Sequence, residues 1–145
     1  MLNQDFKEFI QSLNDNQVRY LVVGGYAVAF HGNPRYTKDL DIWIALSPDN
    51  ASHIVEALNL FGLKSLGLTA TDFLEPDTII QLGYPPNRID LLTTLSGVDF
   101  DSCYTARVQV EIDDTSVNFI DLENLLINKR STGRTQDLAD AEKLS

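Results

Sequence analysis

The chain has 145 residues, of which 43% are hydrophobic and 22% charged, and its formal net charge at pH 7 is −10. These values fit one globular domain over residues 1–145, long enough to bury a proper core. The acidic charge disfavours a protein built mainly to bind duplex nucleic acid, although a locally basic cleft remains compatible with it. The single cysteine excludes an intrachain disulfide and a cysteine-based metal site.

Targeting and membrane signals are not visible in the sequence. No basic stretch followed by an apolar run marks a signal peptide at the start of the chain. No apolar segment reaches the ~18–20 residues that a bilayer-spanning helix needs. We therefore expect no membrane segment and a cytoplasmic location.

The elements predicted for the first half of the chain alternate between helix and strand. Apolar residues spaced at i, i+3, i+4 and i+7 indicate the helices, and short apolar runs indicate the strands. In order, the predictions are a helix over about 3–14, a strand over 18–23, a helix over 26–31, a loop at Asn33-Pro34, a strand over 39–46 and a helix over 50–61. Gly32 and Gly62 suit the C-terminal ends of two of these helices.

The second half of the chain is predicted to be richer in strands. In order, the predictions are paired strands over 78–82 and 88–93 joined through 84–87, a hairpin of strands over 107–112 and 116–120, a helix to about residue 130, and a last helix after Gly133. Asp121 suits the N-cap of the first of these helices, and residues 64–76 are hard to assign. The order predicts an α/β domain with a mixed sheet and helices packed against it.

Two carboxylates share one side of the strand predicted over residues 39–46. Because alternate residues of a strand face the same way, Asp39 and Asp41 point to one side and the intervening apolar residues to the other. Aspartate is a poor strand former and like charges repel, so a divalent cation, Mg²⁺ or Mn²⁺, would compensate. The alternative is that Asp39 ends a loop and Asp41 lies on a solvated edge. For an isolated Asp-x-Asp pair, that alternative has more weight.

A third carboxylate, Asp90, interrupts the apolar strand predicted over residues 88–93. If the two strands pair near each other, three carboxylates converge and could bind two metal ions ~3.5–4 Å apart. One carboxylate could then accept the proton of an incoming hydroxyl. Without metal, mutual repulsion should raise the pKa of at least one of them. The alternative for Asp90 alone is a capped or solvent-facing aspartate.

Gly24-Gly25, Arg35 and Thr37 are candidate phosphate-binding residues. The glycine pair follows a buried strand and opens a helix, where backbone N–H groups can approach a phosphate closely. Arg35 could bind phosphate with two hydrogen bonds, and Thr37 could donate one. The alternatives are a tight turn for the glycines and ordinary loop roles for the other two. The pattern is neither a Walker loop nor a dinucleotide fingerprint.

A basic cluster of Lys129, Arg130 and Arg134 lies near the C-terminus of this acidic chain. One interpretation places it at the mouth of the active site, with Lys129 reaching the triphosphate and Asp137 orienting Lys129 or Arg134. It predicts that Lys129→Ala weakens triphosphate binding and leaves the melting temperature nearly unchanged. The alternative is that these cations only complement the helix dipole.

These residues together resemble a known family. The opening motif of the DNA polymerase β-like nucleotidyltransferase superfamily, and more narrowly of its abortive-infection toxin branch (AbiEii type), is similar to Gly24-Gly25, Ala27, His31-Gly32, Arg35, Thr37 and Asp39-Leu40-Asp41-Ile42. The branch's C-terminal motif is similar to Lys129-Arg130, Gly133-Arg134 and Asp137-Leu138-Ala139-Asp140. The resemblance implies that the glycines bind the triphosphate, that Asp39, Asp41 and Asp90 bind Mg²⁺, and that Lys129 and Asp137 matter to the site.

The function that the resemblance implies is a metal-dependent nucleotidyl transfer. A nucleoside monophosphate would move from NTP, such as ATP, to a hydroxyl of an RNA such as tRNA, of a protein or of a small molecule, with a toxin–antitoxin link. The alternatives are a non-catalytic nucleotide-binding or antitoxin-like interaction module, and an interaction domain that only retains the fold. Larger members carry an extra helical domain. We therefore expect a partner protein or a second copy of this chain, as a homodimer, to hold the acceptor.

Overall fold

A six-stranded mixed sheet forms the centre of the protein. The structure is a computed structural model that describes residues 2–33, 37–84 and 87–145. Its strands are β1 (Tyr20–Val23), β2 (Asp39–Ile44), β3 (Ile79–Leu82), β4 (Arg88–Leu92), β5 (Val108–Ile112) and β6 (Thr115–Phe119). They lie in the order β3-β4-β2-β1-β6-β5. The predicted α/β fold with a mixed sheet is therefore confirmed.

The central strands come from both halves of the chain. β2 pairs antiparallel with β1 and parallel with β4, while β1 pairs parallel with β6. The outer pairs β3–β4 and β5–β6 are antiparallel, as the two predicted strand pairs require. Asp113 and Asp114 have positive φ in the turn between β5 and β6, which aspartate tolerates better than most residues. The parallel pairing of β2 with β4 brings the strands that carry Asp41 and Asp90 next to each other.

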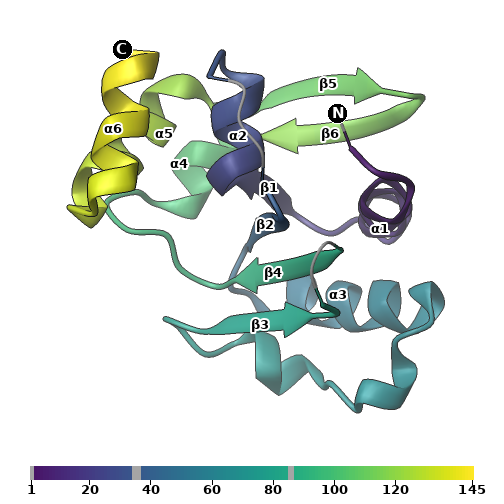
Figure 1. Ribbon diagram of the computed structural model, residues 1–145. Coiled ribbons are helices and arrows are strands. Elements are labelled where there is room, and N and C mark those ends of the chain that lie inside the picture. The colour runs from purple at the N-terminus through teal and green to yellow at the C-terminus, as the bar shows by residue number, and fades with distance from the viewer. Residues whose placement is uncertain (1, 34–36, 85–86) are drawn as a thin grey trace.

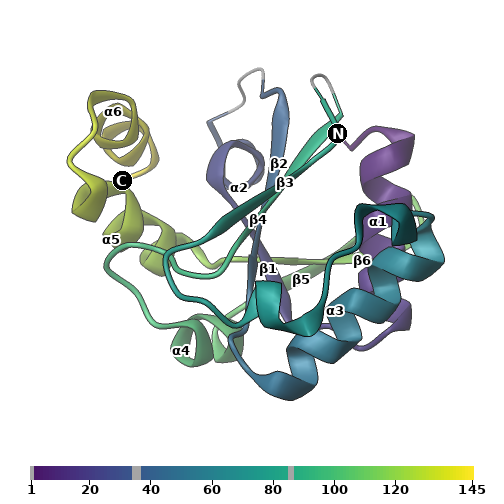
Figure 2. The same ribbon diagram turned by 90° about the horizontal axis from the view of Figure 1, so that it is seen from below.

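Helices cover both faces of the sheet (Figure 1). They are α1 (Gln4–Asp15), α2 (Gly24–Phe30), α3 (Pro48–Phe61), α4 (Phe100–Thr105), α5 (Leu122–Thr132) and α6 (Thr135–Leu144), with short 3-10 helices η1 (Lys64–Leu66) and η2 (Ala70–Phe73). Figure 2 shows α1 and α3 on one side of the sheet and α2, α4, α5 and α6 on the other. None of the helices in the described ranges is long and apolar enough to cross a membrane.

The hydrophobic core lies mainly between the sheet and the layer of α1 and α3. Leu40, Ile42 and Ile44 are fully buried, as their alternation in β2 predicts. Phe9 and Ile10, on the predicted apolar face of α1, are equally inaccessible to solvent. Burying each such side chain contributes about 1.5–3 kcal/mol to folding. The core therefore holds one face of β2, and the opposite face carries Asp39 and Asp41.

Several predicted boundaries were wrong. α2 begins at Gly24 rather than residue 26, β2 ends at Ile44 rather than residue 46, and α5 continues to Thr132. The sequence analysis did not predict α4, and the unassigned segment 64–76 contains η1 and η2. The loop predictions at 33–34 and 84–87 fall in part on residues outside the described ranges.

Candidate active site

Four charged side chains share one face of the sheet, where β2 and β4 run in parallel. The strand register pairs Asp39 with Arg88 and Asp41 with Asp90. Because register partners on neighbouring strands point to the same side, the backbone alone brings three carboxylates and one guanidinium together. Asp39 and Asp41 are partly buried and Asp90 is buried.

Arg88 binds two of the three carboxylates. Its Nη2 donates to Asp39 Oδ2 at 2.6 Å and to Asp90 Oδ2 at 3.2 Å, and its Nε donates to Asp90 Oδ1 at 3.1 Å. The guanidinium therefore forks onto both oxygens of Asp90, a geometry that strengthens the pair. Arg88 was not among the residues predicted from the sequence, although its position two residues before Asp90 on the same strand places both side chains on one face.

Asp41 is the carboxylate that Arg88 leaves unbonded. Among the described residues, nothing donates a hydrogen bond to its side chain. Burial, followed by the charges of Asp90 and Asp39, raises the pKa of Asp41 from 3.8 to about 7. The repulsion expected of three neighbouring carboxylates therefore contributes to the raised pKa, after burial. Gly24 lies against this side chain, since a Cβ at Gly24 would collide with Asp41 Oδ2.

The oxygens of this cluster suit a hard divalent cation, which prefers carboxylate ligands. Among the described residues, neither the buried Asp39 Oδ1 nor the Asp41 carboxylate has a hydrogen-bond partner. With Arg88 bound to Asp39 and Asp90, however, no three Asp, Glu, His or Cys side chains of the described ranges lie close enough to hold an ion. Convergence of the three aspartates on metal therefore stays a prediction.

A cavity of about 400 Å³ opens beside Asp41. The candidate residues from the sequence that line it are Gly24, Gly25, Asp41, Lys129, Arg134 and Asp137. They come from α2, from β2, from the last turn of α5, from the link between α5 and α6, and from the first turn of α6. The cavity thus connects the glycine turn, the carboxylates of Asp41 and Asp137 and two cations, although these residues come from distant parts of the sequence. Asp39, two residues earlier on β2, and Asp90, on the neighbouring strand β4, are not among the described residues that line this cavity.

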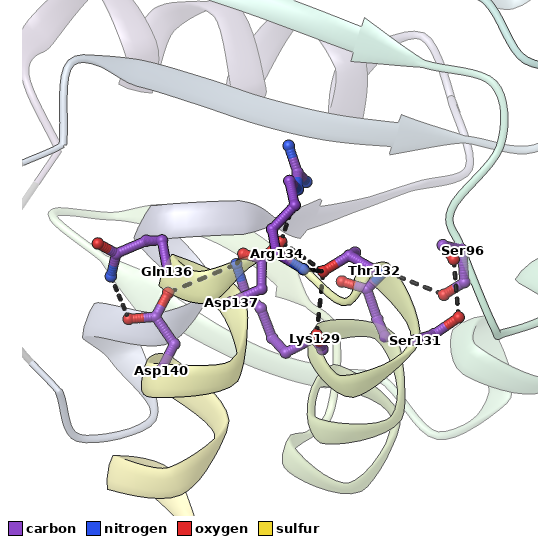
Figure 3. A network of polar contacts seen from close by, with 9 residues as sticks. Ser96, Lys129, Ser131, Thr132, Arg134, Gln136, Asp137 and Asp140 are labelled. Carbon is purple, nitrogen blue, oxygen red and sulfur yellow. Dashed lines mark hydrogen bonds and ion pairs between the residues drawn. The ribbon is translucent and has the colours of Figure 1, made fainter.

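Lys129 and Arg134 are held by one carboxylate, that of Asp137 (Figure 3). Asp137 Oδ1 accepts from Lys129 Nζ at 2.9 Å, and its Oδ2 accepts from Arg134 Nε at 2.9 Å and from Thr132 Oγ1 at 2.7 Å. Burial acts to raise the pKa of Asp137, but the hydrogen bonds from Lys129 and Thr132 outweigh it and lower that pKa. Lys129 also lies 3.7 Å from Asp140 Oδ2.

The three cations of the basic cluster, Lys129, Arg130 and Arg134, lie in different environments. Lys129 is only 5% exposed, whereas the Arg134 side chain is 76% exposed. Arg130 is exposed and is not among the described residues that line the cavity. Because Lys129 neutralises buried carboxylates, its burial leads us to expect that Lys129→Ala lowers the melting temperature, unlike the nearly unchanged value expected from the sequence; both remain predictions.

The two remaining candidates for phosphate binding are Thr37 and Arg35. Thr37 Oγ1 donates to the backbone carbonyl of Asp39 at 3.3 Å, so it braces the start of β2. Arg35 lies outside the described residues, and its phosphate-binding role stays a prediction.

The mixed sheet, with a strand and glycine turn beside a carboxylate-bearing strand, has the fold of the nucleotidyltransferases. The chain belongs to the family described as nucleotidyltransferase of unknown function (DUF6036), whose model matches residues 1–144.

Solved structures show the same fold at low sequence identity. A protein of Thermotoga maritima, provisionally described as a nucleotidyltransferase, superimposes with a TM-score of 0.61 and 15% identity, covering 96% of this chain and 87% of that one. An antigenic nucleotidyltransferase-like protein of Paracoccidioides brasiliensis gives a TM-score of 0.54 and 20% identity, covering 99% and 77%. No curated protein matches significantly in sequence.

Proposed function

We propose that this protein is a metal-dependent nucleotidyltransferase that moves a nucleoside monophosphate from NTP to a hydroxyl group. The observation that carries the proposal is the pairing of Asp41 with Asp90 beside a cavity lined by Gly24 and Lys129. Asp41 in the cavity wall, with Asp90 beside it on the neighbouring strand, and the cations Lys129 and Arg134 suit a metal–triphosphate complex, in which the carboxylates would hold the metal and the cations would bind the leaving phosphates.

In the proposed reaction, the acceptor oxygen forms a bond to the α-phosphorus of NTP while the bond from that phosphorus to the bridging oxygen breaks. Pyrophosphate leaves, and the hydroxyl proton passes to a carboxylate of the cluster, such as Asp90. Asp39, Asp41 and Asp90 would hold Mg²⁺ or Mn²⁺, which supplies charge stabilisation of the reacting phosphate. Gly24-Gly25 would leave room for the triphosphate against the backbone.

Lys129 and Arg134 have different parts in this proposal. Lys129 is fixed by Asp137 inside the cavity wall and would supply a preorganised positive charge to the leaving pyrophosphate. Arg134 is exposed at the rim and would attract the triphosphate from solution, despite the net charge of −10. Asp137 would serve as a positioning residue for both cations.

The decisive experiment is incubation of the protein with radiolabelled ATP, CTP, GTP and UTP in cell extract, with Mg²⁺ or Mn²⁺ present. We expect label to appear on an acceptor, and we expect no label with the Asp39→Ala, Asp41→Ala double variant. Calorimetric titration with Mn²⁺ plus each triphosphate gives a second readout. Equal binding by the wild type and the double variant would refute the proposal. Binding without label transfer would favour the non-catalytic nucleotide-binding module.

The biological role and the acceptor are separate parts of the proposal. A toxin role rests on the resemblance to the abortive-infection branch. Induced expression should then arrest growth with the wild type but not with the double variant. The acceptor would be an RNA such as tRNA, a protein or a small molecule, held by a partner protein or by a second copy of the chain. Identifying the labelled acceptor in the extract would decide among them.

A further inference from the structure

Arg88 occupies the oxygens that a metal ion would need. Both oxygens of Asp90 accept hydrogen bonds from its guanidinium, and Asp39 Oδ2 accepts the shortest one, at 2.6 Å. The side chains of Arg88, Asp39 and Asp90 are 28%, 29% and 11% exposed. These ion pairs are therefore only partly screened by water, and they are stronger than pairs on an open surface.

We propose that Arg88 is an internal cation that competes with the divalent metal for Asp39 and Asp90, so that metal and triphosphate bind together and metal alone binds weakly. This inference rests on the proposed function and adds an order of binding to it. In the metal-free protein, Arg88 keeps two carboxylates neutralised and in register. It must give up at least part of its fork on Asp90 before that carboxylate can act as a metal ligand.

Replacing the Arg88 guanidinium by a metal ion at these carboxylates is unfavourable when no triphosphate is bound. A hydrated Mg²⁺ loses water reluctantly, and in this cluster it would also displace or repel a guanidinium that is tethered to the same strand as Asp90. Within this cluster, and among the described residues, the carboxylate oxygens left without a hydrogen-bond partner are the buried Asp39 Oδ1 and those of Asp41. Without displacing Arg88, a metal ion would find free oxygens, among the described residues of this cluster, only on Asp39 and Asp41. Two carboxylates make a weaker metal site than three.

A triphosphate changes this balance. Its oxygens complete the coordination of the metal, and its negative charge offsets the two cations that would otherwise repel each other. Phosphate is also a good bidentate partner for a displaced guanidinium. Metal and triphosphate should therefore raise each other's affinity by the same factor, because such coupling is reciprocal. Arg88 acts here as a positioning and gating residue, since it touches the ligands of the metal.

The test compares Mn²⁺ binding by the wild type, Arg88→Gln and Arg88→Lys, without and with α,β-methylene-ATP, by electron paramagnetic resonance and calorimetry. For Mn²⁺ alone, we expect Arg88→Gln to bind about 10-fold tighter than the wild type, within the usual range of coupling between sites. Arg88→Lys keeps the positive charge but cannot make the forked pair of hydrogen bonds to both oxygens of Asp90. Its affinity for Mn²⁺ alone should therefore lie between those of the wild type and Arg88→Gln. The matched control is Arg19→Gln, which removes the same charge just before the start of β1, at the end opposite Gly24. This variant should bind Mn²⁺ like the wild type.

The inference is overturned if Arg88→Gln binds Mn²⁺ alone no more tightly than the wild type. If Arg88→Gln does not fold, as circular dichroism would show, Arg88→Lys decides by the same criterion. If only the inference fails, the wild type should still bind Mn²⁺ together with α,β-methylene-ATP, through Asp39 and Asp41. Failure of the proposed function would appear instead as no binding of that complex by any folded variant or by the wild type.

Discussion

Asp41 and Asp90 are register partners on the parallel strands β2 and β4, yet only Asp90 is bonded to Arg88. The two carboxylates therefore lie side by side in different electrostatic environments. Asp90 has a cation in contact with both oxygens, whereas burial and its carboxylate neighbours raise the pKa of Asp41 to about 7. This asymmetry makes Asp41 the group whose charge is least stable without metal.

The first prediction concerns the pH dependence of stability in EDTA. The pKa of Asp41 rises from 3.8 unfolded to about 7 folded, so between these values the folded protein binds more protons than the unfolded chain. The free energy of unfolding should therefore fall as pH rises through this window. Asp41→Asn removes this loss. We expect it to unfold like the wild type at pH ~4 and to be about 1–3 kcal/mol more stable at pH ~8, as urea titration would measure.

The control for this experiment is Asp101→Asn, which removes a carboxylate whose side chain is 85% exposed. Its profile should run parallel to that of the wild type. Adding Mn²⁺ with a triphosphate at the higher pH should reverse the order, stabilising the wild type and not Asp41→Asn. Parallel profiles for the wild type and Asp41→Asn would show that the charge on Asp41 is not costly.

The second prediction is that Lys129→Ala destabilises the fold. Lys129 is buried and pairs with Asp137 at 2.9 Å, so its removal leaves buried negative charge uncompensated. Breaking such a pair lowers the free energy of unfolding by about 3–5 kcal/mol. Denaturant titration should show this loss. Lys143→Ala, which removes an exposed lysine from α6, should change stability little. A midpoint unchanged by Lys129→Ala would mean that water replaces the lysine.

The third prediction separates the two arginines near the end of α5. Arg134 lines the cavity and Arg130 does not, although both are exposed. Arg134→Ala should weaken triphosphate binding about 5–20-fold at low salt and less at high salt, because exposed charges are screened. Its surface pair with Asp137 adds at most about 1 kcal/mol to stability. Calorimetry on Arg134→Ala and Arg130→Ala measures the difference, and equal affinities would place the triphosphate elsewhere.

Most of the fold could be predicted because its signals are local in the sequence. The alternation of Leu40, Ile42 and Ile44 with Asp39 and Asp41 follows from strand geometry, and Asp121 at an N-cap follows from its ability to accept backbone N–H groups. α4 has only six residues, too few to show helical periodicity. Its one local signal was Asp99, whose side chain accepts from the Ser102 N–H.

The candidate site was harder to predict, because its contacts join distant segments. Asp39, Asp41 and Asp90 were identifiable since carboxylates in apolar strands conflict with strand propensity. The bond from Arg88 to Asp39 depends on the parallel register of β2 and β4, which no local pattern specifies. The burial of Lys129 likewise depends on how α6 brings Asp137 against α5.

The glycine turn offers a test of packing against the carboxylates. Gly24 has φ +65° and faces Asp41, where an added Cβ would collide with the carboxylate. Gly67, at the end of η1, has φ +68°, and no atom of the described residues lies within 4 Å of an added Cβ. The two glycines therefore share the same left-handed backbone, which an L-residue adopts at a cost of about 1 kcal/mol. Only Gly24 adds a contact with the proposed metal ligand.

The fourth prediction follows from this comparison. Gly67→Ala should lower the free energy of unfolding by about 1 kcal/mol, through backbone strain alone. Gly24→Ala should lower it by a further ~1–3 kcal/mol, because Asp41 must move or the turn must open. That movement should also weaken binding of Mn²⁺ with α,β-methylene-ATP by about 10-fold or more, since displaced ligands bind metal poorly, while Gly67→Ala binds normally. Urea titration and calorimetry on both variants give the two readouts. Equal losses of stability, with unchanged binding in both variants, would show that the close approach of Gly24 to Asp41 has no part in the site.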